Sequence, residues 1–567
     1  MLQGSGALKM LNGPAMSVAR EVELKLEASS NCLEQLCSHP HFRAMLKEPA
    51  VEQTLNSVYF DTDDFYLLNH GINLRVRQIG DQRLQTLKIV GPSATHFDRT
   101  EIEAKISGET PNLDLATQEC PELSPIAADV RDAIKPVFTT HVERRSYRID
   151  EGDSEIELAL DSGKIVANGS ALPIFEIELE LKRGRPADLF NLARSISSIV
   201  PVQLGLESKA ARGYALLDSR DQVAKAEPVI LTPFGPVDDA FKTIARSCLH
   251  QVLGNAAAVC ARNPAAVHQM RVGMRRLRAA ISVFSEIVRD DQVDQIKDRL
   301  KYYAAELAPA RDLEVMIVDV LRPFRRRHPE DKGFSALIGS YTRRRTKAYE
   351  RAIQAITSDE FRKFTIECAA WIESGPWTDR NVQSNDKGLA GSINVYAAHQ
   401  IGRRCKKLVR RGRHLADLKP HEVHQLRIRA KKLRYAAEFF ESLYGEGKTA
   451  KRSKRFAAAM NDLQEALGAY NDMVVRRTLF TELTAGPQAK RNPAIAFAAG
   501  QIVGEQHGVG RQLLKDATKA LSKLEDIKAF WKVEETQLEA QAEQSSQLEQ
   551  PEGTTQASEL TPQPDAA

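Results

Sequence analysis

The charged residues with the clearest spacing lie near the start of the chain. In the segment R-E-V-E-L-K-L-E (20–27), Glu21, Glu23 and Lys25 alternate with apolar residues. Alternation with a period of two is typical of a β-strand that packs one face on a core. The other face of this strand then carries two carboxylates and an amine, groups that bind metal ions and anions.

The same alternation recurs along the next two hundred residues, with some polar faces acidic and others basic. The faces are Arg75 with Arg77, Thr86 with Lys88, Arg99 with Glu101 and Glu103, Glu155 with Glu157 and Asp161, and Glu176 with Glu178 and Glu180. One charged strand face is usually exposed to solvent, but so many in one small β region suggest that they turn inward. A closed barrel would then have a polar interior, in which cations hold phosphate oxygens and carboxylates hold a bridging Mg²⁺. Phosphoryl transfer needs mainly such positioning and charge neutralisation.

Three helical segments further along the chain carry stripes of basic residues. They are His268, Arg271, Arg275 and Arg278; His399, Arg403, Lys406 and Arg410; and His424, Arg427, Lys431 and Arg434. A solvated helix face usually mixes acids among its bases, whereas these stripes repel themselves unless an anion lies against them. Histidine suits an anion groove because it gains charge near neutral pH, and cationic neighbours disfavour a metal site. Nucleic acid is a rival ligand, but few aromatic residues interleave with the bases to stack on it.

The candidate functional residues fall in two regions that differ in their predicted secondary structure. Short alternating segments separated by Gly, Asp and Pro predict an antiparallel sheet or barrel over 18–218. Long Ala-, Leu-, Arg- and Lys-rich stretches predict helices over 233–525. The segment 219–232 is expected to be a linker, 1–17 a flexible N-terminus, and the Gln-, Glu- and Pro-rich tail 534–567 disordered.

The helical region contains an internal repeat. V-H-Q-M-R-V (267–272) returns as V-H-Q-L-R-I (423–428), and L-A-P-A-R-D-L-E-V (307–315) has an echo in L-G-A-Y-N-D-M-V-V (467–475). Repeats of this length predict two similar helical bundles. The expected halves are about 233–380 and 390–525.

Composition limits the class of protein. The chain has 567 residues, of which 42% are hydrophobic and 27% charged, as expected for a globular protein of several domains. Its seven cysteines are scattered and odd in number, which favours a reducing cytoplasm over a disulfide framework or a zinc site. No apolar run reaches the length of a membrane span. We therefore expect a cytoplasmic protein without a membrane partner.

The ordered motifs of the first region resemble the CYTH, or triphosphate tunnel metalloenzyme, superfamily. The resemblance begins with E-x-E-x-K at Glu21, Glu23 and Lys25. It continues through Y-F-D-T (59–62), L-R-V-R (74–77), T-L-K (86–88), R-x-E-x-E (99–103), R-S-Y (145–147), L-D-S-G (160–163), E-I-E-L-E (176–180) and S-K-x-x-R-G-Y (208–214). It implies an eight-stranded antiparallel tunnel that hydrolyses triphosphates with Mg²⁺ or Mn²⁺.

The resemblance also implies roles for individual residues. Phosphate would be bound by Arg75, Arg77, Lys88, Arg99, Arg145, Lys209 and Arg212, with Arg144 a neighbouring alternative to Arg145. The acidic side, a subset of which would ligate the metal, would consist of Glu21, Glu23, Glu101, Glu103, Asp161, Glu176 and Glu178. The base that orients the attacking water is left open between Lys25, assisted by Tyr59, and a carboxylate such as Glu176. Asp61 and Thr62 are either turn residues or part of the site.

The repeated H-Q-x-R pattern resembles the CHAD domain, a conserved histidine α-helical domain. The resemblance covers about 233–525 and implies a pair of four-helix bundles that bind inorganic polyphosphate. The polyphosphate-binding residues would be the three stripes together with Arg276 and Lys432. Lys431 and Lys432 replace Arg275 and Arg276 in the second copy, which keeps the charge but loses bidentate geometry.

The sequence thus predicts an α+β protein that hydrolyses tripolyphosphate with Mg²⁺ and binds polyphosphate, and that could associate with polyphosphate granules. Alternatives are a thiamine, nucleoside or RNA triphosphatase, a class IV adenylyl cyclase, or a binding protein whose tunnel only grips polyphosphate. The intact carboxylate set argues against the last, because an anion grip needs no acids. Oligomeric state stays open.

Overall fold

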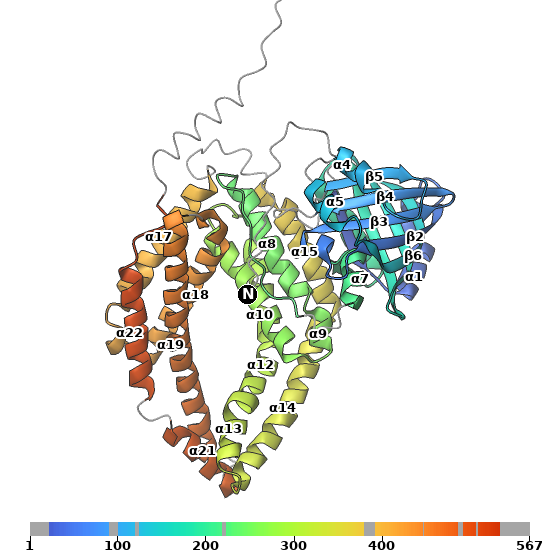
Figure 1. Ribbon diagram of the computed structural model, residues 1–567. Helices are drawn as coiled ribbons and strands as arrows, with labels where there is room; N and C mark the ends of the chain where they lie inside the picture. The colour runs from blue at the N-terminus through green and yellow to red at the C-terminus, as the bar shows by residue number, and fades with distance from the viewer. Residues whose placement is uncertain are drawn as a thin grey trace, which may run out of the picture.

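The computed structural model describes residues 22–89, 100–119, 124–217, 223–378, 392–445, 447–485, 492–505 and 509–532. Within these ranges the first region forms one sheet, and the second is helical (Figure 1). The strands are β1 (Val22–Glu27), β2 (Val51–Asp61), β3 (Ile72–Ile79), β4 (Gln82–Ile89), β5 (Thr100–Ile106), β6 (Lys135–Glu151), β7 (Ser154–Ala167), β8 (Ser170–Arg183) and β9 (Gln203–Gly205).

The strands lie in the order β5-β4-β3-β2-β6-β7-β8-β1-β9, and neighbouring strands run antiparallel. The sequence predicts eight strands, whereas the described sheet has nine. The additional strand is β9, which follows α6 (Pro186–Ile199) and pairs with β1. It is only three residues long, so it is too short to show the alternation that reveals a strand in a sequence.

The outer face of the sheet is apolar and is covered by helices. Leu24 and Leu26 of β1 are fully buried and belong to one core with Leu36 and Leu192. Their burial holds the strand with its alternate, charged face turned the other way. The remaining helices of this region are α1 (Ser30–Ser38), α2 (Pro40–Met45), α3 (Tyr66–Asn69), α4 (Leu113–Glu119), α5 (Ser124–Val130) and α7 (Lys209–Leu217).

The regular elements among the described residues of the second region are helices. Its elements are α8 (Val237–Leu253), α9 (Ala256–Cys260), α10 (Pro264–Val283), α11 (Val293–Glu306), α12 (Ala308–Val315), η2 (Met316–Leu321), α13 (Arg322–Arg327), α14 (Lys332–Ile356), α15 (Asp359–Ser374), α17 (Ile393–Gly412), η3 (Leu415–Asp417), α18 (Pro420–Phe439), η4 (Glu441–Tyr444), α19 (Gly447–Ala485), α21 (Pro493–Glu505) and α22 (Val509–Glu525). Figure 1 shows α10, α12 and α14 on one side and α18, α19 and α22 on the other. Helix α21 contacts both α14 and α19.

The two copies of the repeat form equivalent helices. Helices α10 and α18 each have 20 residues and begin with a proline. The sequence separation between their first residues, and between their last residues, equals that between His268 and His424. The two helices contact each other. The repeat therefore places its two basic stripes on neighbouring helices.

The two regions share an apolar core. Helix α15 of the helical region contacts α6 and β9 of the β region, and Phe364 and Ile196 belong to the same buried cluster. In the described ranges, no helix is both long enough and apolar enough to cross a bilayer.

Candidate active site and basic groove

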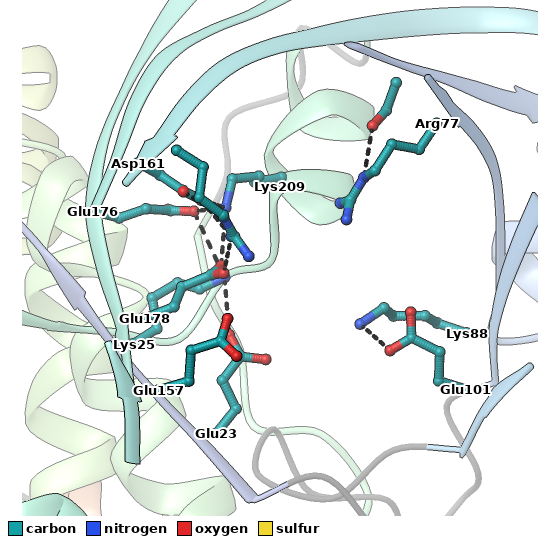
Figure 2. A network of polar contacts seen from close by, with 12 residues as sticks. Glu23, Lys25, Arg77, Lys88, Glu101, Glu157, Asp161, Glu176, Glu178 and Lys209 are labelled. Atoms are coloured by element: carbon teal, nitrogen blue, oxygen red, sulfur yellow. Dashed lines mark hydrogen bonds and ion pairs between the residues drawn. The ribbon is translucent and has the colours of Figure 1, made fainter. Parts of the chain in front are cut away.

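The sheet surrounds a cavity of about 240 Å³. Each strand from β1 to β8 contributes at least one side chain to its wall, so the charged strand faces turn inward (Figure 2). The lining residues are Glu23, Lys25, Tyr59, Asn73, Arg75, Arg77, Lys88, Glu101, Glu103, Arg144, Glu157, Ala159, Glu178, Glu180, Ser208, Lys209 and Ala210.

One side of the cavity, the basic wall, consists of Tyr59, Arg75, Arg77 and Lys88. Glu101 is its main counter-ion, with one oxygen 3.3 Å from Arg75 Nη2 and the other 2.7 Å from Lys88 Nζ. Arg77 instead donates from Nε to the Ser57 hydroxyl at 3.3 Å. Burial, and then the charge of Arg75, lower the pKa of Arg77 to about 10. An anion bound here would stabilise the charged form of Arg77 and raise its pKa.

Tyr59 lies on the basic wall between two guanidinium groups. Burial opposes ionisation of its hydroxyl, but the charges of Arg75 and Arg77 outweigh burial and lower the pKa of Tyr59. The Tyr59 ring stacks on Phe138 with 4.4 Å between ring centroids. This stacking fixes the hydroxyl as a polar group of the wall.

The opposite side of the cavity contains three carboxylates, Asp161, Glu176 and Glu178, which we call the inner cluster. One oxygen of each lies within 4.8 Å of the others. Asp161 and Glu176 face each other in the pairing of β7 with β8 and have no exposed surface. Three like charges so close together require positive partners.

The positive partners of the inner cluster come from β1, β6 and α7. Lys209 Nζ contacts Asp161 at 2.7 Å and Glu178 at 2.9 Å, and also contacts Glu176. Arg144 donates two hydrogen bonds of 2.7 Å to Asp161 and contacts Glu178. Lys25 Nζ lies 2.8 Å from Glu178, and Arg212 Nη1 lies 3.2 Å from Glu176.

These contacts keep Lys25 protonated and Glu178 ionised. Burial alone would lower the pKa of Lys25, but the charges of Glu178 and Glu176 outweigh it and raise that pKa. Burial would likewise raise the pKa of Glu178, but Lys209 and Lys25 hold it well below the ordinary carboxyl value. Lys25 therefore stays protonated near neutral pH and can donate a hydrogen bond, which makes it unsuitable as a general base.

A second acidic set, the outer row, consists of Glu23, Glu180 and Glu157. Glu180 is paired with Glu23 on β1 and with Glu157 on β7, so the three residues lie side by side across adjacent strands. Their side chains are 27%, 27% and 38% exposed, respectively. Lys25 lies 3.7 Å from Glu23, and Lys182 contacts the other two. The outer row is thus more open to solvent than the inner cluster.

Helix α7 is docked against the cavity by a buried polar contact. The Tyr214 hydroxyl donates to Asp61 at 2.8 Å. Asp61 also accepts hydrogen bonds from the backbone N–H groups of Thr62, Leu67 and Leu68. Of the two interpretations of the Y-F-D-T motif, the contacts support a structural one, in which Asp61 holds α3 and α7 in place.

A close approach of α7 to the sheet depends on Gly213. A Cβ atom at this position would lie 2.2 Å from the ring of Phe138, which is closer than any side-chain contact allows. Phe138 in turn supports Tyr59, as described above. The docking of α7 therefore fixes Lys209, its first residue, and the basic wall together.

The structure brings most of the predicted site residues together. Lys25, Tyr59, Arg75, Arg77, Lys88, Lys209, Glu23, Glu101, Glu103 and Glu178 line the cavity. Asp161 and Glu176 lie behind its surface and contact the lining residue Lys209. Arg212 lies behind Glu176 and contacts it. Glu21 and Arg99 lie outside the described residues.

One predicted position is corrected. Arg144, and not Arg145, points into the cavity, because successive side chains of a strand face opposite sides. The pairing of β6 with β7 places Arg144 beside Asp161 and Arg145 beside Leu160. The cavity lining also includes Asn73, Ser208, Glu157 and Glu180, which had no predicted role. Glu157 and Glu180 belong to the acidic strand faces that the sequence shows.

The carboxylates fit a hard divalent cation in chemical terms. Mg²⁺ prefers oxygen ligands, and the inner cluster supplies three carboxylates with oxygens close enough to share one ion. The outer row supplies three more that are exposed to the cavity. Mg²⁺ bound at either set would polarise a phosphoryl oxygen and neutralise charge on a bound polyphosphate.

The helical region contains a second concentration of charge, which we call the basic groove after the anion groove that the sequence predicts. It is formed by the half-buried residues His268, Arg271 and Arg275 of α10, Arg427 and Lys431 of α18, and Arg311 of α12. Burial, followed by the charge of Arg311, lowers the pKa of His268 to about 4. Burial, followed by the charges of Arg427 and Arg275, lowers the pKa of Lys431 to about 8. The basic stripes of the two repeat copies, on α10 and α18, thus lie close enough to repel each other in the basic groove.

The basic groove contains few counter-ions and some unpaired donors. Asp312 accepts from Arg271 at 3.2 Å, and Asp472 raises the pKa of Lys431 only partly. In the described residues, the buried Nε atoms of Arg275 and Arg427 donate to no acceptor. An acceptor-rich anion would satisfy such donors.

Not all predicted polyphosphate-binding residues lie in the groove. Arg276 is 1% exposed and is held by Glu438 at 3.2 Å and Gln251 at 2.9 Å, so it links α10 to α18 and α8. The α17 stripe, His399, Arg403, Lys406 and Arg410, is exposed. Arg311 belongs to the first echo of the repeat, which was the sequence signal that could have identified it.

The fold and the two sites define an antiparallel β-tunnel domain followed by a helical domain. The family model described as the CYTH domain matches residues 19–214. The family model described as the CHAD domain matches residues 243–481. The chain therefore carries a CYTH domain followed by a CHAD domain.

Individual relatives match one or both domains. An inorganic triphosphatase of Haemophilus influenzae is 32% identical over 199 residues, which cover 35% of this chain and 55% of that protein. An uncharacterized protein of Mycobacterium tuberculosis is 26% identical over 536 residues, covering 88% of this chain and 96% of the relative. The crystal structure of the CHAD domain from the plant Ricinus communis is 26% identical with a TM-score of 0.44, covering 54% of this chain and 97% of that one.

Proposed function

We propose that the CYTH domain hydrolyses inorganic tripolyphosphate to pyrophosphate and phosphate with Mg²⁺, or Mn²⁺ in its place. The observation that carries this proposal is one cavity with a basic wall opposite two sets of carboxylates. A polyphosphate chain needs cations for its oxygens, and its hydrolysis needs charge neutralisation at the bond that breaks. The similarity of 199 residues of this chain to an inorganic triphosphatase supports this reaction.

The basic wall holds the substrate in this proposal. Arg75, Arg77 and Lys88 bind phosphate oxygens, and Arg77 gains most because its charge lacks a carboxylate partner among the contacts of the wall. The Tyr59 hydroxyl donates a further hydrogen bond. Arg144 and Lys209 orient the carboxylates of the inner cluster through their hydrogen bonds and ion pairs.

The attacking water is positioned on the acidic side. Lys25 is held protonated by Glu178 and donates to the substrate rather than removing a proton. Glu176 is fully buried between Lys209 and Arg212, so its carboxylate is not open to a water in the cavity, and we do not assign it as the base. We assign proton acceptance to the outer row, because its carboxylates are open to the cavity.

The cavity favours a bare polyanion over a substrate with an organic group. Tyr59 is the aromatic residue among its lining side chains, and that ring is already stacked on Phe138. A nucleobase or thiazole ring would find no free stacking partner in this lining. This argues against a thiamine or nucleoside triphosphatase and against an adenylyl cyclase.

A substrate panel tests this part of the proposal. Phosphate release by the full chain is measured with tripolyphosphate, ATP, thiamine triphosphate and long-chain polyphosphate, with Mg²⁺ and with EDTA. We expect Mg²⁺-dependent release that is fastest from tripolyphosphate. Faster release from ATP or thiamine triphosphate, or formation of cyclic AMP, would favour the corresponding alternative. No release from any compound, together with polyphosphate binding, would indicate a pure binding protein.

The CHAD domain is proposed to bind inorganic polyphosphate in the basic groove. The supporting observation is the set of half-buried, mutually repelling cations on α10, α12 and α18. Binding of fluorescent polyphosphate by the full chain should fall when Arg275 is replaced by Met and remain when Lys454, an exposed residue of α19, is replaced in the same way. Equal binding by the two variants would remove the groove from the proposal. Tighter binding of single-stranded nucleic acid than of polyphosphate would favour the nucleic-acid alternative.

A further inference from the structure

The side chain of Lys209 lies at the centre of the inner cluster. Figure 2 shows it between Asp161, Glu176 and Glu178, and its ammonium group contacts all three. These are also the three carboxylates whose oxygens are close enough to share one metal ion. The ammonium group thus uses the same oxygens that a divalent cation would use.

The negative charge of the inner cluster is already more than compensated by its neighbours. The three carboxylates contact four cations, Lys25, Arg144, Lys209 and Arg212. A divalent cation added to this set would lie among surplus positive charge at short range, where repulsion is strong. Withdrawal of one cation, or arrival of an anion, is needed before the cluster can accept a metal ion.

Lys209 is the cation best placed to withdraw. Lys25 and Arg144 lie within β1 and β6, whose backbones are fixed by pairing on both sides. Lys209 is instead the first residue of α7 and follows the segment 206–208, which lies outside the helices and strands. It also lines the cavity, so its flexible side chain can turn toward a ligand there without a change in the sheet.

We infer that Lys209 is an internal counter-ion that must leave the inner cluster before a divalent cation binds there. A triphosphate in the cavity would attract the ammonium group and release the carboxylates, so metal and substrate would load together. This inference rests on the proposed function for its substrate, but the competition between Lys209 and metal is a property of the free protein. The inner cluster would then be protected from metal until substrate arrives.

The inference is tested by metal binding without substrate. Free Mn²⁺ is measured by electron paramagnetic resonance during titration of the full chain and of Lys209→Met, Lys209→Arg and Lys164→Met. Lys164 is an exposed residue of β7 and provides the matched control. We expect Lys209→Met to bind Mn²⁺ about tenfold or more tightly than the wild type, because one full charge is removed at contact distance. Lys209→Arg and Lys164→Met should bind like the wild type.

Three outcomes would overturn the inference. They are equal Mn²⁺ affinity of Lys209→Met and wild type, an equal gain in Lys164→Met, or a gain in Lys209→Arg. Circular dichroism checks that each variant is folded, and Lys209→Gln replaces Lys209→Met if the latter is not. A failure of the proposed function would appear separately, as no phosphate release by the wild type, and would leave the Mn²⁺ result unchanged.

Discussion

Replacement of Lys431 by Met should make the free protein more stable and its polyphosphate binding weaker. Lys431 lies in the basic groove, where burial and the charges of Arg427 and Arg275 lower its pKa from 10.5 to about 8. The folded state therefore disfavours the charged amine. Near neutral pH, where Lys431 is mostly charged, this lowers the free energy of unfolding of the wild type. Met has a similar apolar stem without the charge.

The magnitude follows from that pKa. The difference between 10.5 and about 8 corresponds to at most about 3.4 kcal/mol. The side chain is only half-buried, so solvent screening reduces the expected gain in the free energy of unfolding to about 1–2 kcal/mol. Because the pKa of Lys431 is lower in the folded state than in the unfolded state, the loss of stability in the wild type has its full size below about pH 8. It disappears as pH rises toward the unfolded value of 10.5.

Thermal unfolding at pH 7 and pH 10.5, followed by circular dichroism, measures this effect. We expect Lys431→Met to have a Tm several degrees above the wild type at pH 7, about 2–4 °C per kcal/mol, and an equal Tm at the higher pH. Lys454→Met, at an exposed position of α19, should not differ from the wild type. A lower Tm of Lys431→Met at pH 7, or a gain that persists at pH 10.5, would refute the reasoning.

Two further predictions concern the CYTH domain. Arg144→Met removes two hydrogen bonds to Asp161, which keeps its contact with Lys209, so it should lower stability by about 1–3 kcal/mol and abolish phosphate release. Arg145→Met should retain most activity, and similar activity losses in both variants would contradict the placement of Arg144. Gly213→Ala introduces a Cβ atom 2.2 Å from the ring of Phe138, so it should displace α7, lower Tm and raise KM for tripolyphosphate. Unchanged kinetics would show that the docking of α7 is unimportant for substrate binding.

Much of the fold could be predicted because its signals are local and periodic. The alternation around Glu23 and Lys25 identifies both a strand and its charged face, and burial of Leu24 and Leu26 decides which face turns inward. Strand β9 has no such signal, because its three residues are ordered by pairing with β1. Long-range pairing of this kind is not encoded in the pattern of a short segment.

The site was predictable in residue type but not in register. Adjacent Arg144 and Arg145 are chemically identical, and only the pairing with β7 decides which one meets Asp161. Arg276 belongs to the repeated motif, yet packing of α10 against α8 and α18 buries it. The structural role of Asp61 depends on Tyr214, which is 153 residues away in sequence. Such contacts arise from tertiary structure alone.

The proposed function requires that the two walls of one cavity act together in Mg²⁺-dependent hydrolysis. A ³¹P NMR time course of tripolyphosphate with Mg²⁺ tests it most directly, using the wild type, Arg77→Met from the basic wall, Glu178→Gln from the inner cluster, and Glu52→Gln at an exposed position of β2. We predict equal amounts of pyrophosphate and phosphate from the wild type and Glu52→Gln, and almost none from the two wall variants or with EDTA. Undiminished hydrolysis by either wall variant, or hydrolysis that persists in EDTA, would contradict the account.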